Sequence, residues 1–110
     1  PLTKIPAYSG AKAAVSNFTQ WLATHFAHRG IQVNAIAPGF FLTDQNRSLL
    51  MEVEGNWTAR AQAILAQTPT GKLGKPEDLI GPVVMLCSPA SDFISGAVIP
   101  IDGAYSSFSV

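Results

Sequence analysis

Tyr8 and Lys12 lie four residues apart in a segment with a helical pattern. On a helix this spacing places both side chains on one face. An isolated phenol has a pKa of about 10, too high for a base at neutral pH. An ammonium about 4 Å away in a partly screened site is worth roughly 4 kcal/mol, enough to lower the pKa of a phenol by up to about 3. The pair is therefore a candidate general acid/base, although the same spacing also fits a buried tyrosine beside a solvated lysine.

The elements around this pair alternate between helical and extended patterns. Apolar residues at three- and four-residue steps predict a long helix, with Ala11, Val15, Phe18, Leu22 and Phe26 forming its core stripe. The predicted order is a helix at 7–28 ended by Gly30, a strand at 31–37 ended by Pro38-Gly39, a helical excursion at 40–70, a helix at 76–87 and a strand at 97–101.

This order predicts the closing part of an α/β parallel sheet. Near-continuous apolar strands suit a parallel sheet that is covered on both faces. We expect the two strands to be neighbours joined by a right-handed crossover. Since two strands do not make a stable parallel sheet alone, the remaining strands must come from elsewhere.

The composition narrows the class of protein. The chain has 110 residues, of which 47% are hydrophobic and 13% charged, against a typical charged fraction of about 25%. Its zero net charge provides no basic footprint for nucleic acid, and no apolar run approaches the roughly 20 residues of a membrane span. Its single cysteine, Cys87, has no partner for an internal disulfide, which favours a cytoplasmic location. The chain opens at Pro1 without an initiator methionine, so we expect a fragment.

Other patterns indicate no further chemistry. His25 and His28 are three residues apart without nearby acidic or cysteine ligands, so we expect no metal site. The segment 71–75 is not a phosphate-binding loop, because a proline takes the place of its first glycine and another follows its lysine. Cys87 is predicted to be a small core residue, and Asp102 to order the last turn.

Five motifs follow one another in a recognisable order, and together they span essentially the whole chain. They are Tyr8-Ser9-Gly10-Ala11-Lys12-Ala13-Ala14, Gln32-Val33-Asn34-Ala35-Ile36-Ala37-Pro38-Gly39, Gly71-Lys72-Leu73-Gly74-Lys75-Pro76-Glu77-Asp78, Ser95-Gly96 and Ile101-Asp102-Gly103. This order resembles the C-terminal part of a short-chain dehydrogenase/reductase. The resemblance implies the C-terminal portion of a Rossmann-like doubly wound parallel sheet.

A narrower resemblance rests on the segments 16–22, 38–47 and 103–109, which look like those of bacterial D-mannonate oxidoreductases (D-fructuronate reductases). It implies hydride transfer between a nicotinamide cofactor and a sugar acid. The cofactor would be NAD, with NADP not excluded. Another sugar or polyol dehydrogenase, or a non-catalytic relative that acts in assembly, stays open as an alternative.

The resemblance also implies roles for single residues. Tyr8 would exchange a proton with the substrate oxygen and also contact the cofactor. Lys12 would hold the cofactor ribose and lower the pKa of the tyrosine. Pro38 and Gly39 would form the wall beside the nicotinamide. The list of cofactor contacts is completed by the backbone of Phe41 and the hydroxyl of Thr43, although Thr43 could equally be a helix N-cap.

The substrate and the partners are also expected from the resemblance. A carboxylate substrate calls for an arginine or several polar donors, and Arg47 beside Asn46 is the candidate, with Arg60 and Lys72 as weaker ones. Oligomerisation to a homodimer or homotetramer is expected, with the tail 105–110 reaching a neighbouring subunit. The family's glycine-rich loop and catalytic serine do not occur in this chain, so the chain alone is expected to be inactive.

Overall fold

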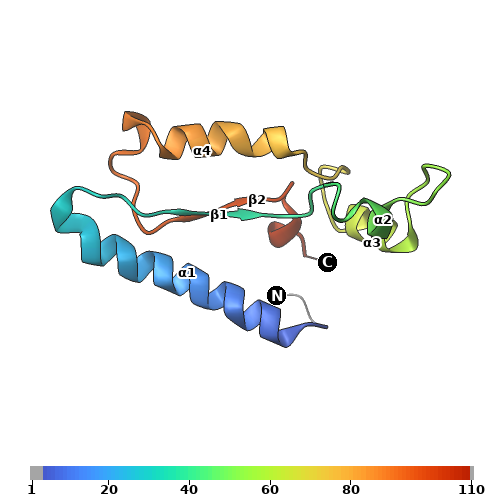
Figure 1. Cartoon of the computed structure of the whole chain (residues 1–110), viewed down its shortest axis with the longest axis horizontal. Coiled ribbons are helices and arrows are strands. Elements are labelled where there is room, and N and C mark those ends of the chain that lie inside the picture. Colours follow the sequence, from blue (N-terminus) through green and yellow to red (C-terminus); the bar gives the residue numbers. More distant parts are fainter. Residues whose placement is uncertain (1–3, 110) are drawn as a thin grey trace. The chain divides into compact units, whose positions relative to one another are not determined.

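The computed structural model describes residues 4–109 and divides them into two units. The first contains the described residues up to Ile36 together with Met85–Ile99. The second contains Ala37–Val84 and the described residues from Pro100 onward. Figure 1 labels the principal elements, which are α1 (Pro6–Phe26), β1 (Ala35–Pro38), α2 (Arg47–Leu50), α3 (Ala59–Ala66), α4 (Ile80–Leu86) and β2 (Val98–Ile101). Single 3₁₀ turns cover Ala27–Arg29, Pro76–Leu79, Pro89–Ser91 and Tyr105–Ser107.

The two strands are hydrogen-bonded neighbours in a parallel ladder. The backbone N–H of Ala35 donates to Ala97, and that of Gly39 donates to Ile101, so both strands advance in the same direction. This confirms the predicted α/β class with parallel neighbours. The first strand was predicted to begin at residue 31, which is wrong, because β1 begins at Ala35.

The side chain of Asn34 explains the late start of β1. Its Nδ2 donates to the carbonyl of Ile94 at 2.7 Å, and its Oδ1 accepts from the N–H of Ala97 at 3.0 Å. A side chain therefore provides at this position the bonds that a regular ladder would provide from the backbone.

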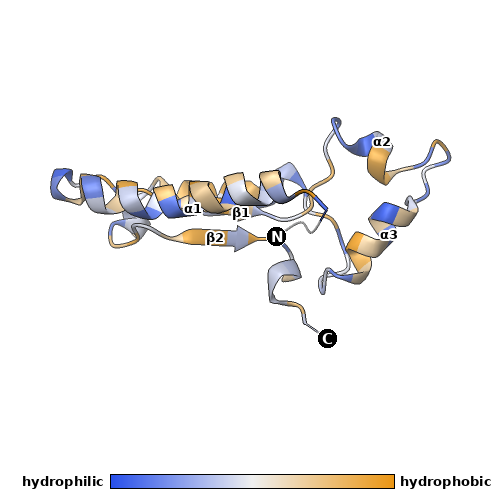
Figure 2. Ribbon diagram, turned by 90° about the horizontal axis from the view of Figure 1, so that it is seen from below, coloured by the Kyte–Doolittle hydropathy of each residue, from blue (hydrophilic) through white to orange (hydrophobic). Residues whose placement is uncertain are grey.

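The long helix α1 begins at Pro6, a residue whose missing N–H costs nothing in the first turn. It ends in a 3₁₀ turn capped by Gly30, which adopts a φ of 69°. Apolar positions recur along α1 in Figure 2. The predicted core stripe is nevertheless wrong in part, because Val15 and Phe18 are each 56% exposed.

The buried positions of α1 are Thr19 and Ala23. Ala23 faces Gly96, where an added Cβ would lie 3.5 Å from the alanine methyl. Within this unit only a narrow part of the helix is covered, so large side chains stay in solvent. Phe18, Trp21 and His25 form a row of stacked rings on the exposed part, with centroids 5.7 and 4.7 Å apart.

The core of the second unit joins α2 and α3 to the segment that follows them. Its buried members are Leu50, Ala61, Ile64 and Leu73. Thr58 caps α3 by accepting from the N–H of Ala61. The helices α2 and α3 confirm the predicted helical character of the excursion at 40–70.

The predicted helix at 76–87 consists of a 3₁₀ turn followed by α4. Pro82 lies near the start of α4, where a missing N–H leaves few helical bonds unmade. Cys87 is exposed, so the expectation that it is a core residue is wrong for this chain. The described part of the chain contains no helix with the length and apolar character that crossing a membrane requires.

Candidate active site

In the first unit, Tyr8 and Lys12 lie on the same side of α1, close to its first turns. The Lys12 Nζ is 5.4 Å from the centroid of the Tyr8 ring, a distance at which a cation is attracted to the ring face. Tyr8 as a whole is 50% exposed. The shared helix face is confirmed, and the alternative of a buried tyrosine does not hold for this chain.

In the second unit, the chain that leaves β1 is held by close backbone contacts. Gly39 donates its N–H to Ile101 at 3.0 Å. A Cβ on Gly39 would lie 2.6 Å from the Cβ of Asp102 and 2.7 Å from its Cα. The absence of a side chain at Gly39 is thus required by the neighbouring strand end, independently of any cofactor.

The next residues pair with the segment that precedes α4. Phe41 forms an isolated parallel bridge with Gly74, whose own N–H donates to the carbonyl of Phe40. A Cβ on Gly74 would lie 2.7 Å from the Phe41 ring. This pairing and the close approach of Gly74 to its ring fix the position of Phe41, one of the predicted cofactor contacts.

Asn46 builds the turn that follows. Its Oδ1 accepts from the N–H of Thr43 at 2.9 Å, and its Nδ2 donates to the carbonyl of Phe41 at 2.8 Å. The helix α2 begins at Arg47, and its N-cap position is Asn46. Thr43 is therefore not a helix N-cap, and its exposed hydroxyl points from a turn that Asn46 holds.

Arg47 lies at the first position of α2 with a side chain that is 55% exposed. Its Nη2 is 3.6 Å from the carboxylate of Asp44, which is fully exposed. Exposed pairs of this kind contribute about 0–1 kcal/mol. The guanidinium can therefore exchange Asp44 for another carboxylate at little cost.

Asp102 orders the turn after β2, as predicted. Its Oδ1 accepts from the N–H of Ala104 at 3.0 Å, and its Oδ2 accepts from the N–H of Ser106 at 2.9 Å. Hydrogen bonds from Ser106, followed by that from Ala104, hold the pKa of the Asp102 carboxyl below its ordinary value. Both oxygens of the Asp102 carboxylate therefore hold the backbone of this turn.

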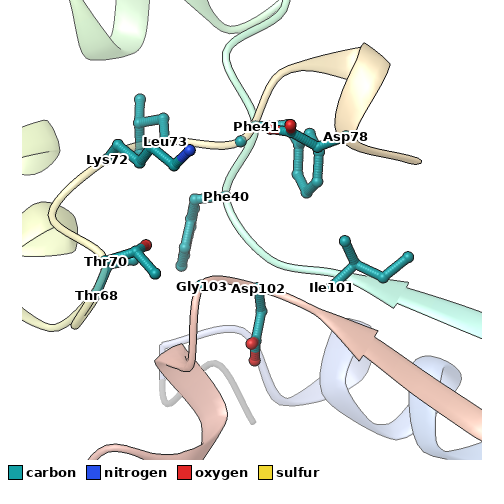
Figure 3. Close-up of a pocket in the computed structure, with 11 residues that line it drawn as sticks. Phe40, Phe41, Thr68, Thr70, Lys72, Leu73, Asp78, Ile101, Asp102 and Gly103 are labelled. Atoms are coloured by element: carbon teal, nitrogen blue, oxygen red, sulfur yellow. The ribbon is translucent and has the colours of Figure 1, made fainter. Parts of the chain in front are cut away.

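The two strand ends border a pocket of about 170 Å³, shown in Figure 3. Phe40 extends into this region between the segment 70–73 and the turn at Gly103. Asp102 carries its carboxylate away from Phe40, toward the final turn. Among the described residues, no group of three or more His, Cys, Asp or Glu side chains is arranged to hold a metal ion.

Comparison with known proteins identifies the family. A family model described as "Enoyl-(Acyl carrier protein) reductase" matches residues 2–106. The chain belongs to the short-chain dehydrogenase/reductase family. It is 51% identical over 110 residues to "Uncharacterized oxidoreductase UxuB" of Bacillus subtilis, covering 99% of this chain and 40% of that protein.

Two further members carry more specific names. The 2-dehydro-3-deoxy-D-gluconate 5-dehydrogenase of Dickeya dadantii is 39% identical over 93% of this chain and 38% of its own length. A crystal structure from Haemophilus influenzae, described as a "putative D-Mannonate oxidoreductase" with bound NAD, is 55% identical. It superposes with a TM-score of 0.91 over 99% of this chain and 39% of its own. The chain thus spans about two fifths of the length of the curated relatives it matches.

Sequence reasoning missed residues whose roles are structural. The amide of Asn46 holds the turn that carries two predicted contacts, and Gly74 and Gly103 allow close packing. The asparagine before a short helix was a usable signal, since asparagine favours helix starts and turns. The ring contacts of Phe40 leave no such signal, because they depend on segments far apart in the sequence.

Proposed function

We propose that this chain is the C-terminal part of an NAD-dependent oxidoreductase that interconverts D-mannonate and D-fructuronate. The observation that carries the proposal is the Tyr8–Lys12 pair on one face of α1, in a chain that superposes closely on an NAD-bound relative named for D-mannonate. The reaction class and the sugar-acid substrate agree with the names of the relatives.

Each unit carries groups of the kind that hold a nicotinamide dinucleotide. Lys12 has an exposed ammonium with three donors for ribose hydroxyls. The exposed Pro38 and the hydroxyl of Thr43 follow the end of a parallel strand, the part of an α/β sheet where nucleotides bind. Phe41 would contribute backbone contacts to the cofactor. When bound, the reduced nicotinamide supplies a hydride to the keto carbon of the substrate.

Tyr8 acts as the general acid during reduction. Its hydroxyl proton passes to the substrate oxygen as that oxygen gains negative charge, and the phenolate left behind carries the charge. The positive charge of the Lys12 ammonium, 5.4 Å from the ring centroid, stabilises this phenolate. In the reverse direction the phenolate takes the proton from the alcohol.

Arg47 and Asn46 are the proposed substrate contacts. Arg47 presents a guanidinium whose exposed partner Asp44 is readily displaced, and a guanidinium binds a carboxylate with two parallel hydrogen bonds. Asn46 directly precedes Arg47 at the start of α2, and its side chain holds the turn before that helix. A homodimer or homotetramer, a cytoplasmic location and inactivity of the isolated chain belong to the same proposal.

The test is NADH oxidation by the full-length protein, with D-fructuronate and other keto sugars as substrates. Tyr8→Phe keeps the ring beneath Lys12 and removes only the proton donor, so we expect a loss of about 100-fold or more in kcat. Lys12→Met should also lower activity, whereas Lys4→Met, the same charge change before the helix, should not. NADH binding without turnover of any sugar would instead favour the assembly alternative.

A second candidate is dehydrogenation of another sugar acid. The similarity to a 2-dehydro-3-deoxy-D-gluconate 5-dehydrogenase favours it. Comparison of kcat/KM for that substrate and for D-fructuronate decides between the two.

A further inference from the structure

Tyr105, in the last 3₁₀ turn, contacts both ends of the excursion at 40–70. Its ring meets the ring of Phe40 edge to face, with centroids 5.2 Å apart. Its hydroxyl donates to the Oε1 of Gln67 at 3.0 Å. Phe40 is the first residue of the excursion, and Gln67 caps the C-terminus of α3 near its end.

The tail that begins at residue 105 stays predicted to reach a neighbouring subunit. Its first side chain, that of Tyr105, is partly buried against its own chain. Gly103 reinforces this position, because its carbonyl accepts from the N–H of Thr70 at 3.3 Å. With a φ of 64°, Gly103 packs so closely that an added Cβ would lie 3.0 Å from the methyl of Thr68.

Two routes lead from Tyr105 to the proposed substrate contacts. Through Phe40 the ring supports the adjacent Phe41, whose carbonyl accepts from the Asn46 side chain. Through Gln67 the hydroxyl holds the end of α3. The buried residues of α3 pack on Leu50 at the end of α2, the helix that Arg47 begins.

The two contacts differ in how much each is supported by other interactions. The start of the excursion is also held by the backbone pairing of Phe40 and Leu42 with Gly74. The end of α3 borders a hollow of about 190 Å³, which Tyr105, Gln67 and Phe40 help to line. The contact between Tyr105 and the end of α3 is therefore not packed on every side, so we expect the hydrogen bond to contribute a larger share of what fixes α3 to the tail.

We propose that Tyr105 is a positioning residue that ties the two ends of the 40–70 excursion together and thereby sets the placement of Asn46 and Arg47 toward the acid substrate. The inference rests on the proposed function for its substrate. The hydroxyl fixes the α3 end, and the ring fixes the strand end.

The test separates these contacts in the full-length enzyme. Tyr105→Phe removes the hydroxyl and keeps the ring on Phe40. We expect the KM for D-fructuronate to rise about two- to tenfold, the range that one neutral hydrogen bond is worth. The KM for NADH should change less than twofold, because the strand end stays in place. Gln67→Met should produce the same rise, and the double variant should show no further one.

Two controls accompany these variants. Gln67→Glu keeps an acceptor oxygen and should retain the wild-type KM. Ser107→Ala removes a hydroxyl from the same 3₁₀ turn, where the side chain makes no hydrogen bond to the described residues, and should have no effect.

Additive effects of the two single variants, an equal rise in the KM for NADH, or an unchanged KM for the acid would each overturn the proposal. If the wild-type protein turns over no sugar acid, the proposed function fails instead. The same variants then test the tie through their urea unfolding midpoints, where non-additive losses support it and additive losses refute it.

Discussion

Replacing Gly39 by alanine tests the closest backbone contact at the candidate site. The added Cβ would lie 2.6 Å from the Cβ of Asp102 and 2.7 Å from its Cα, whereas ordinary contact begins at 3.4 Å. One strand end must therefore retreat by about 0.8 Å. Neither of these two Asp102 atoms is the far end of a flexible side chain, so side-chain rotation cannot relieve the overlap.

The retreat would strain three hydrogen bonds. One joins the N–H of Gly39 to Ile101, and the other two are accepted by the Asp102 carboxylate. Overpacking costs about 1–3 kcal/mol, and partial loss of one hydrogen bond adds about 1 kcal/mol. We expect Gly39→Ala to lower the free energy of unfolding by about 2–4 kcal/mol.

The assay is urea unfolding of the full-length protein, followed by circular dichroism. Gly81→Ala is the matched control, because a Cβ there would have nothing within 4 Å and the residue lies in α4. Alanine in a helix is favoured over glycine, so the control should gain up to about 1 kcal/mol. If Gly39→Ala unfolds at the wild-type midpoint while the control behaves as expected, the packing argument is refuted.

Three further predictions follow from single residues. Asn46→Ala removes two hydrogen bonds and should cost about 1–3 kcal/mol in unfolding free energy, while an unchanged midpoint would contradict its role in the turn. Arg47→Ala should raise the KM for the acid substrate about 10- to 100-fold, as loss of a charged hydrogen bond does, and Arg60→Ala should not; the reverse result would reassign the carboxylate site. Because hydrogen bonds from Ser106 lower the pKa of Asp102 from 3.8, its contribution to stability is complete above about pH 4 and is lost as pH falls through the lowered pKa. Asp102→Asn should reduce that acid-side loss in pH-dependent melting, and an identical pH profile would exclude this linkage.

Much of the fold could be predicted because its signals are local. The period of the apolar residues and the position of Gly30 place α1 within two residues at each end. The order of helices and strands was enough to predict parallel neighbours. The start of β1 could not be predicted, because the side chain of Asn34 replaces backbone bonds across a sequence separation of 60 residues or more.

The candidate site, like the fold, could be predicted only in part. The Tyr8–Lys12 spacing predicted a shared helix face, since α1 has a regular period. The burial of α1 was predicted less well. The spacing of apolar residues shows which positions of a helix could pack against another segment, but it does not show which of them are covered. Val15 and Phe18 were therefore wrongly assigned to the core.

The sequence by itself determined the family, the order of the elements and the residues available for acid/base chemistry, because residue type and short-range spacing carry that information. Only the tertiary structure shows that Gly39 must lack a side chain because Asp102 lies against it. It also decided that Tyr105 joins Phe40 to Gln67. These contacts depend on segments brought together by folding, whose separation along the chain leaves no periodic or local signal.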